Sequence, residues 1–106
     1  MNRSYAEQKT GCSIINLFGE WALIDKLGVV IKLSRVKRAR DAFKELHDWF
    51  YRQIQQKALF RAGNKCERCG STYMLGCHHK QHRSQGGAHS LENIDVLCQE
   101  CHAQEH

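Results

Sequence analysis

Residues 66–69 read Cys-Glu-Arg-Cys and residues 98–101 read Cys-Gln-Glu-Cys, so two C-x-x-C pairs lie 28 residues apart. Each pair directs two thiolates at one point, and together the pairs supply the four soft ligands of a tetrahedral zinc ion. A disulfide framework would require an oxidising compartment, which nothing else in the sequence indicates. A bound metal also stabilises a segment of about 40 residues, which is too short to build a sufficient core. We therefore predict a structural zinc site formed by Cys66, Cys69, Cys98 and Cys101.

The composition is that of a globular protein. The chain has 106 residues, of which 42% are hydrophobic and 25% are charged. No apolar run reaches the roughly 18 residues that cross a bilayer, and the N-terminal MNRSYAEQKTG lacks the pattern of a signal peptide. We expect a cytoplasmic protein with no membrane partner. The two cysteines outside the pairs, Cys12 and Cys77, are expected to be small buried apolar side chains.

Positive charge is concentrated in the middle of the chain. The formal net charge is +5, and residues 35–65 carry nine basic against three acidic side chains. Residues 66–106 carry three basic against five acidic side chains, so the segment with the cysteine pairs is acidic. The basic segment is therefore the expected source of contacts to nucleic-acid phosphates, although a merely solvated helix face is the alternative. The residues expected to make these contacts are Arg35, Lys37, Arg38 and Arg40.

The spacing of apolar residues predicts two helices before the cysteine pairs. The first has Ser13 as its N-cap and Gly28 as its stop, and its apolar positions are Ile14, Leu17, Phe18, Trp21 and Ile24. Residues 28–33 fit either a short strand or the start of the next helix.

A second apolar stripe predicts one long helix over residues 34–61, which ends at Gly63 in a left-handed cap. Its buried positions recur at intervals of three and four: Val36, Ala39, Phe43, Leu46, Phe50 and Ile54. The aromatic side chains of this helix, including Phe43, Trp49 and Phe50, are expected to pack against the first helix. A homodimer face is the alternative.

From residue 65 onward the pattern changes to a tight turn, two strands and a short helix. We expect strands at residues 72–79 and 94–97, a polar loop at 81–90 and a helix from residue 101. The predicted fold class is α+β. A helical, basic region covers residues 1–64, and a zinc-stabilised ββα element covers residues 65–106.

Four histidines and one asparagine accompany the cysteine pairs: His78, His79, Asn93, His102 and His106. Neighbouring residues of a strand point to opposite faces, so His78 and His79 are expected to have different roles. His102 and His106 lie four residues apart, on one face of the predicted helix, as two ligands of a metal do. The zinc turn brings that helix back toward the histidine pair. The other histidines are expected to be surface groups: His47, His82 and His89.

Residues 66–106 resemble the HNH endonucleases, the zinc-stapled branch of the ββα-metal nucleases. The matching strings are CERCG, CHHKQHRSQGG and LENIDVLCQECHAQEH. The resemblance implies a metal-dependent endonuclease that hydrolyses DNA phosphodiester bonds and leaves a 5′-phosphate and a 3′-hydroxyl. The residues before this segment resemble no family that we identify.

Carried over position by position, the resemblance makes His79 the general base that takes a proton from the attacking water. His78 and His102 would hold one catalytic divalent metal, with His106 as a further ligand. Asn93 would either ligate the metal or hold the long loop so that His79 stays oriented.

The residue types suit this chemistry. An imidazole is partly neutral and basic near physiological pH, and a metal held by imidazoles neutralises the charge that develops on the phosphate. Imidazole ligands leave the identity of the metal open among Zn, Mn, Ni and Mg. Arg83, in the loop beside the base, is expected to contact the phosphate of the strand that is cut. His82 stands where the family commonly has proline, so we expect a less constrained loop with an extra imidazole near the site.

The expected partner is double-stranded DNA with weak sequence preference, because no base-reading module is evident. RNA and branched DNA are not distinguished, since chemistry on the backbone looks alike for each. The resemblance implies an element that sits at the minor groove and cuts one strand, so that a homodimer is needed for double-strand breaks. It also favours a phage or prophage origin. The alternative function is a non-catalytic zinc module that binds nucleic acid or protein, although such a module needs neither His79 nor Asn93.

Overall fold

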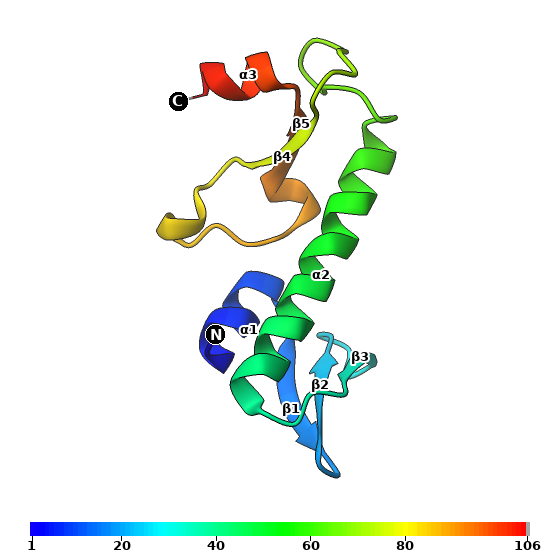
Figure 1. The fold of residues 1–106 in the computed structure, drawn as a ribbon, viewed down its shortest axis with the longest axis vertical. Coiled ribbons are helices and arrows are strands. Elements are labelled where there is room, and N and C mark those ends of the chain that lie inside the picture. Colours follow the sequence, from blue (N-terminus) through cyan, green and yellow to red (C-terminus); the bar gives the residue numbers. More distant parts are fainter. Residues whose placement is uncertain (106) are drawn as a thin grey trace. The chain divides into compact units, whose positions relative to one another are not determined.

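The computed structural model describes residues 1–105, which combine helices with two antiparallel sheets (Figure 1). The elements in chain order are α1 (Arg3–Thr10), β1 (Ser13–Leu17), β2 (Glu20–Ile24), β3 (Val30–Ser34), α2 (Ala39–Arg61), β4 (Gly76–His79), the 3-10 turns η1 (Arg83–Gln85) and η2 (Leu91–Asn93), β5 (Ile94–Leu97) and α3 (Gln99–Gln104). The chain forms two compact units, Met1–Arg52 and Gln53–His106. This architecture confirms the predicted α+β class.

The helix predicted over residues 14–27 is wrong, because this stretch forms a β-hairpin. Strands β1 and β2 pair antiparallel, with Ile14 opposite Leu23. The turn between them contains Phe18 and Gly19, whose φ angles of 53° and 92° are left-handed and stop any helix. Ile14 and Leu23 are buried, whereas Phe18 at the turn is fully exposed. The β-branched and aromatic residues of the two strands favour this pleated arrangement.

Strand β3 completes a three-stranded sheet in the order β1-β2-β3. It pairs antiparallel with β2, with Ala22 opposite Leu33. Of the two alternatives for residues 28–33, the strand is therefore the one that forms.

The sequence analysis missed helix α1. Its residues show little apolar periodicity, and its ends are set by polar contacts and backbone freedom. Asn2 caps the first turn, since its Oδ1 accepts a hydrogen bond from the backbone N–H of Tyr5 at 2.8 Å. Gly11 ends the helix in a left-handed conformation with φ 71°.

The core of the first unit joins α1, the sheet and the beginning of α2. Its buried members are Ala6, Ile14, Leu23, Phe43 and Leu46. The Trp21 ring contacts Phe43 edge to face, with centroids 4.9 Å apart. Trp49 and Phe50 are half-buried against the same cluster. The aromatic side chains of the long helix therefore pack within the first unit. They contact strands β1 and β2 as well as helix α1, and not a second helix at residues 14–27.

Helix α2 confirms the long helix that was predicted, although it begins at Ala39 instead of residue 34. The helix starts later than predicted because Ser34 is the last residue of strand β3. At its C-terminus, Gly63 has φ 65° and donates a hydrogen bond to the Phe60 carbonyl at 3.1 Å, so the predicted left-handed cap is confirmed. Within residues 1–105, no helix combines the length and apolar character that crossing a membrane requires.

In the second unit, β4 and β5 form a two-stranded antiparallel sheet that precedes α3. His78 lies opposite Asp95, and His79 lies opposite Ile94. Strand β5 has the predicted bounds, whereas β4 is shorter than predicted because Met74 adopts a left-handed φ of 46°. Helix α3 begins at Gln99, two residues earlier than expected.

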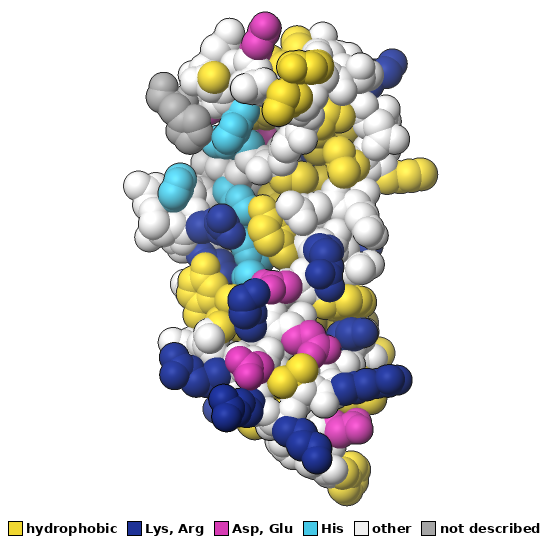
Figure 2. Space-filling view, viewed as in Figure 1, with side chains coloured by type: hydrophobic (Ala, Val, Ile, Leu, Met, Phe, Trp, Pro, Cys, Tyr) yellow, Lys and Arg dark blue, Asp and Glu magenta, His cyan; other side chains and the backbone are white. Residues whose placement is uncertain are grey.

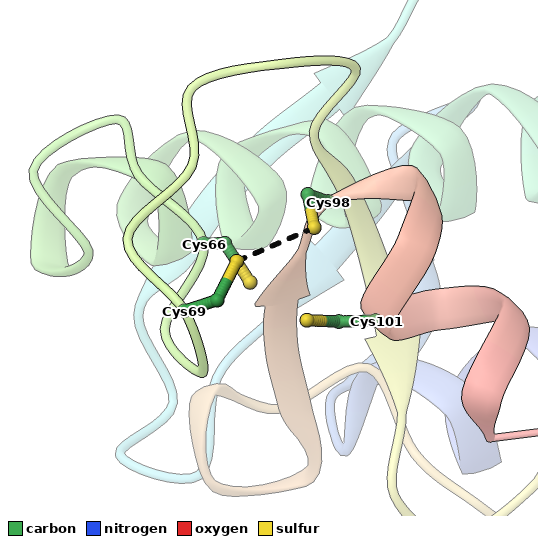
Figure 3. A group of neighbouring side chains, drawn as sticks. All are labelled: Cys66, Cys69, Cys98 and Cys101. Atoms are coloured by element: carbon green, nitrogen blue, oxygen red, sulfur yellow. Dashed lines mark hydrogen bonds between the residues drawn. The ribbon is translucent and has the colours of Figure 1, made fainter.

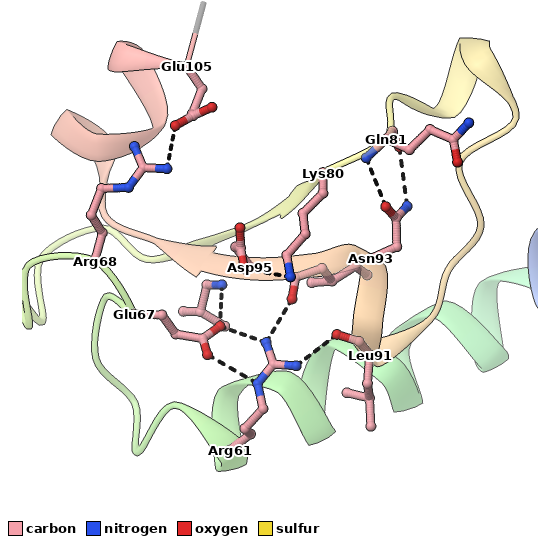
Figure 4. Close-up of polar contacts among 11 residues, drawn as sticks. Arg61, Glu67, Arg68, Lys80, Gln81, Leu91, Asn93, Asp95 and Glu105 are labelled. Carbon is pink, nitrogen blue, oxygen red and sulfur yellow. Dashed lines mark hydrogen bonds and ion pairs between the residues drawn. The ribbon is translucent and has the colours of Figure 1, made fainter.

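Arg61, the last residue of α2, connects the helix end to three other segments of the second unit (Figure 4). Its Nε and Nη2 donate to the two carboxylate oxygens of Glu67 at 3.1 and 2.6 Å. Its Nη1 and Nη2 donate to the carbonyls of Leu91 and Ile94, each at 2.7 Å. Glu67 Oε1 also accepts the backbone N–H of Val96 at 2.8 Å. Burial raises the pKa of the Glu67 carboxyl, but the hydrogen bonds from Arg61 and Val96 outweigh burial and lower it overall.

We expect Arg61→Leu to lower the free energy of unfolding of the second unit by about 2–3 kcal/mol, because hydrogen bonds to a charged partner are lost and the Glu67 carboxylate keeps its burial without its cation. Arg61→Lys keeps the charge but not the planar fork, so it should recover less than half of this loss. Urea unfolding followed by circular dichroism, with zinc in excess, measures both. Wild-type stability in Arg61→Lys would contradict a role for the fork.

Candidate metal centre and histidine site

The four paired cysteines meet at one point in the second unit (Figure 3). Their Sγ atoms all lie within 4.8 Å of one another, and those of Cys69 and Cys98 are 3.6 Å apart. A tetrahedral zinc site with Zn–S bonds of about 2.3 Å needs sulfur atoms about 3.8 Å apart. All four are free thiols. The donor set and its spacing therefore fit a structural zinc ion, as predicted.

Local backbone hydrogen bonds turn the first pair inward. The Cys66 N–H donates to the Ser71 carbonyl at 2.8 Å, and the Gly70 N–H donates to the Cys66 carbonyl at 2.9 Å. The Arg68 N–H points at Cys66 Sγ at 3.4 Å. The second pair spans the start of α3, whose first turn is closed by the hydrogen bond from the His102 N–H to the Cys98 carbonyl at 2.9 Å.

The cluster carries more thiols than can ionise together without a cation. Burial raises the pKa of the Cys66 thiol, but backbone donors, those of Cys98 and Cys69 first, lower it to about 6. Burial, helped by the neighbouring thiols, raises the pKa of Cys101 to about 12. The surroundings of Cys66 therefore favour the thiolate, whereas those of Cys101 oppose it. A divalent cation is the group that lets all four thiols ionise.

Cys12 and Cys77 lie outside this cluster. Both side chains are half-buried, and burial raises the pKa of each thiol. This agrees with their expected role as small apolar side chains.

Strand β4 and helix α3 bring His78 and His102 together. Their ring centroids are 5.2 Å apart, and the rings lie nearly perpendicular. His102 is exposed and His78 is half-buried, so the pair is accessible to solvent. His106, the further ligand implied by the resemblance, lies outside the described residues.

His79 makes a different contact. Its Nε2 lies 2.9 Å from Nδ1 of His89, and the two ring centroids are 5.1 Å apart. Neighbouring residues of a strand point to opposite faces, so the side chains of His78 and His79 lie in different environments, as expected.

Asn93 fastens the loop that connects β4 to η2 (Figure 4). Its Oδ1 accepts the backbone N–H of Gln81 at 2.8 Å, and its Nδ2 donates to the Gln81 carbonyl at 3.2 Å. Its Nδ2 also donates to the Ala88 carbonyl at 2.9 Å. The side chain therefore bonds both ends of the loop. Of the two roles that the resemblance left open, this geometry favours holding the loop.

The loop is closed by a close backbone approach at Gly87. Its N–H donates to the His82 carbonyl at 3.0 Å, and a Cβ at this position would lie 1.8 Å from the Gln81 carbonyl oxygen. His82 has φ −59°, the value that a proline ring would fix. Its Nδ1 caps η1 by accepting the backbone N–H of Ser84 at 3.4 Å, and it also lies 2.8 Å from Ser84 Oγ. These hydrogen bonds hold the turn at the position where the family commonly has proline.

Two histidines that were expected at the surface are buried. His89 is 1% exposed and His47 is 5% exposed, whereas His82 is exposed as expected. His47 belongs to the first unit, where its Nδ1 lies 2.9 Å from Asp48 Oδ1. The sequence analysis missed His89 as a functional candidate. Its position between Gly87, which closes the loop, and Asn93, which fastens it, is the signal that could have marked it.

The basic residues expected to contact nucleic acid are exposed. Figure 2 shows several Lys and Arg side chains gathered on the visible face of the first unit. The exposed basic residues of the β3–α2 connection and the start of α2 are Arg35, Lys37, Arg38 and Arg40. Arg83 is exposed in η1 of the second unit.

The second unit thus combines a four-cysteine cluster with a β4–β5–α3 arrangement that carries histidines, which is the architecture of a zinc-stabilised ββα element. Residues 66–106 match the HNH endonuclease family, and this match confirms the resemblance found in the sequence. The matched segment begins at the first cysteine of the cluster and includes every histidine of β4, the loop and α3. No curated protein and no solved structure matches the chain.

We expect the four-cysteine cluster to hold one zinc ion per chain, apart from any metal at His78 and His102. Cys98→Ser removes one of four ligands, so the variant should lose zinc and the second unit should unfold. Cys12→Ser and Cys77→Ser are the matched controls and should retain one zinc each. Elemental analysis and thermal melting test this expectation, and a full zinc content in Cys98→Ser would contradict it.

We expect Gly87→Ala to lower the free energy of unfolding by more than about 2 kcal/mol, because the new methyl group collides with the backbone at Gln81. Gly76→Ala is the control in the same unit, since its Cβ meets open space and its effect should stay within about 0.5 kcal/mol. Amide hydrogen exchange of the loop should speed up only in Gly87→Ala. Equal stability of the two variants would contradict the close approach.

Proposed function

We propose that this chain is a metal-dependent HNH endonuclease that hydrolyses DNA phosphodiester bonds. The observation that carries the proposal is that two neighbouring histidines of β4 make different contacts, within the segment that matches the family. His78 lies against His102, whereas His79 lies against a buried histidine on the loop. A zinc module with a purely structural role needs neither arrangement, so this observation does not favour the non-catalytic alternative.

In this proposal His79 is the general base, which removes a proton from the water that attacks phosphorus. His78 and His102 hold one divalent metal, with His106 as a further ligand. Zn, Mn, Ni and Mg are the candidate ions. When bound, such a metal neutralises charge on the phosphate and on the leaving oxygen. The accessibility of the histidine pair suits a site that must admit a polymer.

Asn93 and Gly87 act on the loop in this proposal. The amide of Asn93 bonds the backbone at Gln81 and Ala88, and Gly87 permits the tight closure. These contacts reduce the freedom of the segment that lies against His79. A base held in one orientation loses less entropy when the transition state forms.

The contacts to DNA are proposed for basic residues outside the acidic zinc element. Arg83 is exposed in the loop beside the base and suits a phosphate of the strand that is cut. The exposed basic residues of the first unit supply further phosphate contacts: Arg35, Lys37, Arg38 and Arg40. Contacts of this kind position the protein without reading sequence, so weak sequence preference follows.

A homodimer would be required to cut both strands. Free thiols throughout the chain suit a reducing compartment such as the cytoplasm.

A supercoiled plasmid tests the reaction. Wild type and His79→Ala are each freed of the catalytic metal and then supplied with Mg, Mn, Ni or Zn. We expect wild type to convert the plasmid to open-circular or linear DNA, and His79→Ala to be slower by about 10²- to 10⁴-fold because it lacks the general base. Zinc content and circular dichroism of the variant serve as the control for folding.

Failure of both proteins to cut with any of these metals, while the structural zinc stays bound and the fold is intact, would contradict DNA cleavage. The non-catalytic zinc module would then be the better hypothesis. The same assay on RNA and on branched DNA distinguishes substrates that the sequence leaves open.

A further inference from the structure

We propose that His89 is a positioning residue for His79: it accepts a hydrogen bond from His79 Nε2 and so fixes the tautomer in which Nδ1 of His79 is the basic atom. This inference rests on the proposed function of His79 as the general base. It assigns a role to a buried histidine that the zinc cluster and the metal ligands do not use.

The contact between the two imidazoles has the geometry of a hydrogen bond. Nε2 of His79 and Nδ1 of His89 are 2.9 Å apart, and the rings meet at 63° with centroids separated by 5.1 Å. The rings are therefore joined through their edges and are not stacked. His89 is 1% exposed, so its side of this contact is shielded from water.

The hydrogen-bonding capacity of imidazole determines what this contact does. A neutral imidazole has one nitrogen that donates and one that accepts, so a bond between two such rings fixes a tautomer in each. His79 can act as a base only through a nitrogen without a hydrogen. Nε2 of His79 is directed at the buried His89, so the proposal assigns Nδ1 as the nitrogen that takes the proton from water. Nε2 must then carry the hydrogen and donate it to Nδ1 of His89.

The loop holds His89 in place for this role. The residue before it, Ala88, has its carbonyl bonded by Asn93 Nδ2 at 2.9 Å. Gly87, one residue further back, closes the loop onto the backbone at His82. The contacts that fasten the loop are therefore adjacent in sequence to the histidine that touches the base. This gives Asn93 a route to His79 that does not require it to touch the metal.

The cost of burying an imidazole supports a polar role for His89. A buried polar side chain lowers stability unless its polar atoms are bonded, and a leucine of similar size would fill the space at no such cost. A second interpretation of two close ring nitrogens is a shared metal ion. A tetrahedral zinc ion with Zn–N bonds of about 2.0–2.1 Å needs nitrogen atoms about 3.3–3.4 Å apart. The two nitrogens lie 2.9 Å apart, which suits a hydrogen bond better.

Three substitutions of His89 separate positioning from packing. Asparagine places its amide where Nδ1 lies, glutamine places its amide where Nε2 lies, and leucine has no polar atom. We expect His89→Leu and His89→Gln to lower kcat about 10- to 100-fold with little change in KM. A loss of this size is typical when a residue that orients an active-site histidine is removed. His89→Asn should recover most of the lost kcat. Wild-type cleavage by His89→Leu, or an equal loss in all three variants, would overturn the proposal.

A spectroscopic measurement tests the hydrogen bond without cleavage. In zinc-loaded wild type with ¹⁵N-labelled histidine, NMR should detect a coupling across the bond between His79 Nε2 and His89 Nδ1, with the hydrogen on His79. A hydrogen on His89 Nδ1, no coupling, or replacement of the bond by a second equivalent of Zn²⁺ bound to both rings would overturn the proposal. If wild type cuts no DNA, the proposed function fails, and this spectrum still determines whether His89 fixes the tautomer of His79.

Discussion

Four thiols that converge on one point constrain the second unit more than any other interaction. The first pair precedes β4, and the second pair spans the end of β5 and the start of α3. Bringing the sulfur atoms within 4.8 Å of one another therefore closes the end of the sheet at which Gly76 lies opposite Leu97. The thiols differ widely in their tendency to ionise, and a divalent cation removes that conflict. The placement of α3 beside β4, and with it the contact between His78 and His102, depends on this cluster. We therefore expect the histidine site to depend on the metal that this cluster is suited to hold.

Polar contacts supplement the small core of this unit. Its buried apolar cluster around the metal site consists of three of the cysteines and Leu97, with Leu75 packed against them. Arg61 connects the end of α2 to Glu67 and to two backbone carbonyls, and Asn93 connects the two ends of the loop. Each of these side chains forms hydrogen bonds with backbone groups. In a unit with a larger core, such backbone groups would pair with one another in strands or helices. Charged hydrogen bonds are worth more than neutral ones, which suits a unit with little apolar area to bury.

The sequence allowed the second unit to be predicted better than the first, because metal ligation restricts residue type and spacing together. Two C-x-x-C pairs specify the cluster, and the short apolar stretch Ile94-Asp95-Val96-Leu97 marks β5. In the first unit, the spacing of Ile14, Phe18 and Trp21 fits a helical stripe equally well, and the Phe18-Gly19 turn is not a typical hairpin dipeptide. Helix α1 could not be found from apolar periodicity, since a side-chain cap and a glycine set its ends. The burial of His89 follows from closure of the loop by contacts between residues 5 to 12 positions apart, which follow no helical or strand periodicity.

The central claim is that a water molecule, activated by His79, attacks the phosphorus of a DNA backbone. Cleavage of a linear duplex in H₂¹⁸O, followed by mass spectrometry of the products, tests it most directly. The account predicts one ¹⁸O atom on each new 5′-phosphate, with an unlabelled 3′-hydroxyl on the other fragment. Label on a 3′-phosphate, a cyclic phosphate product, or no cleavage with any of Mg, Mn, Ni and Zn supplied would contradict it.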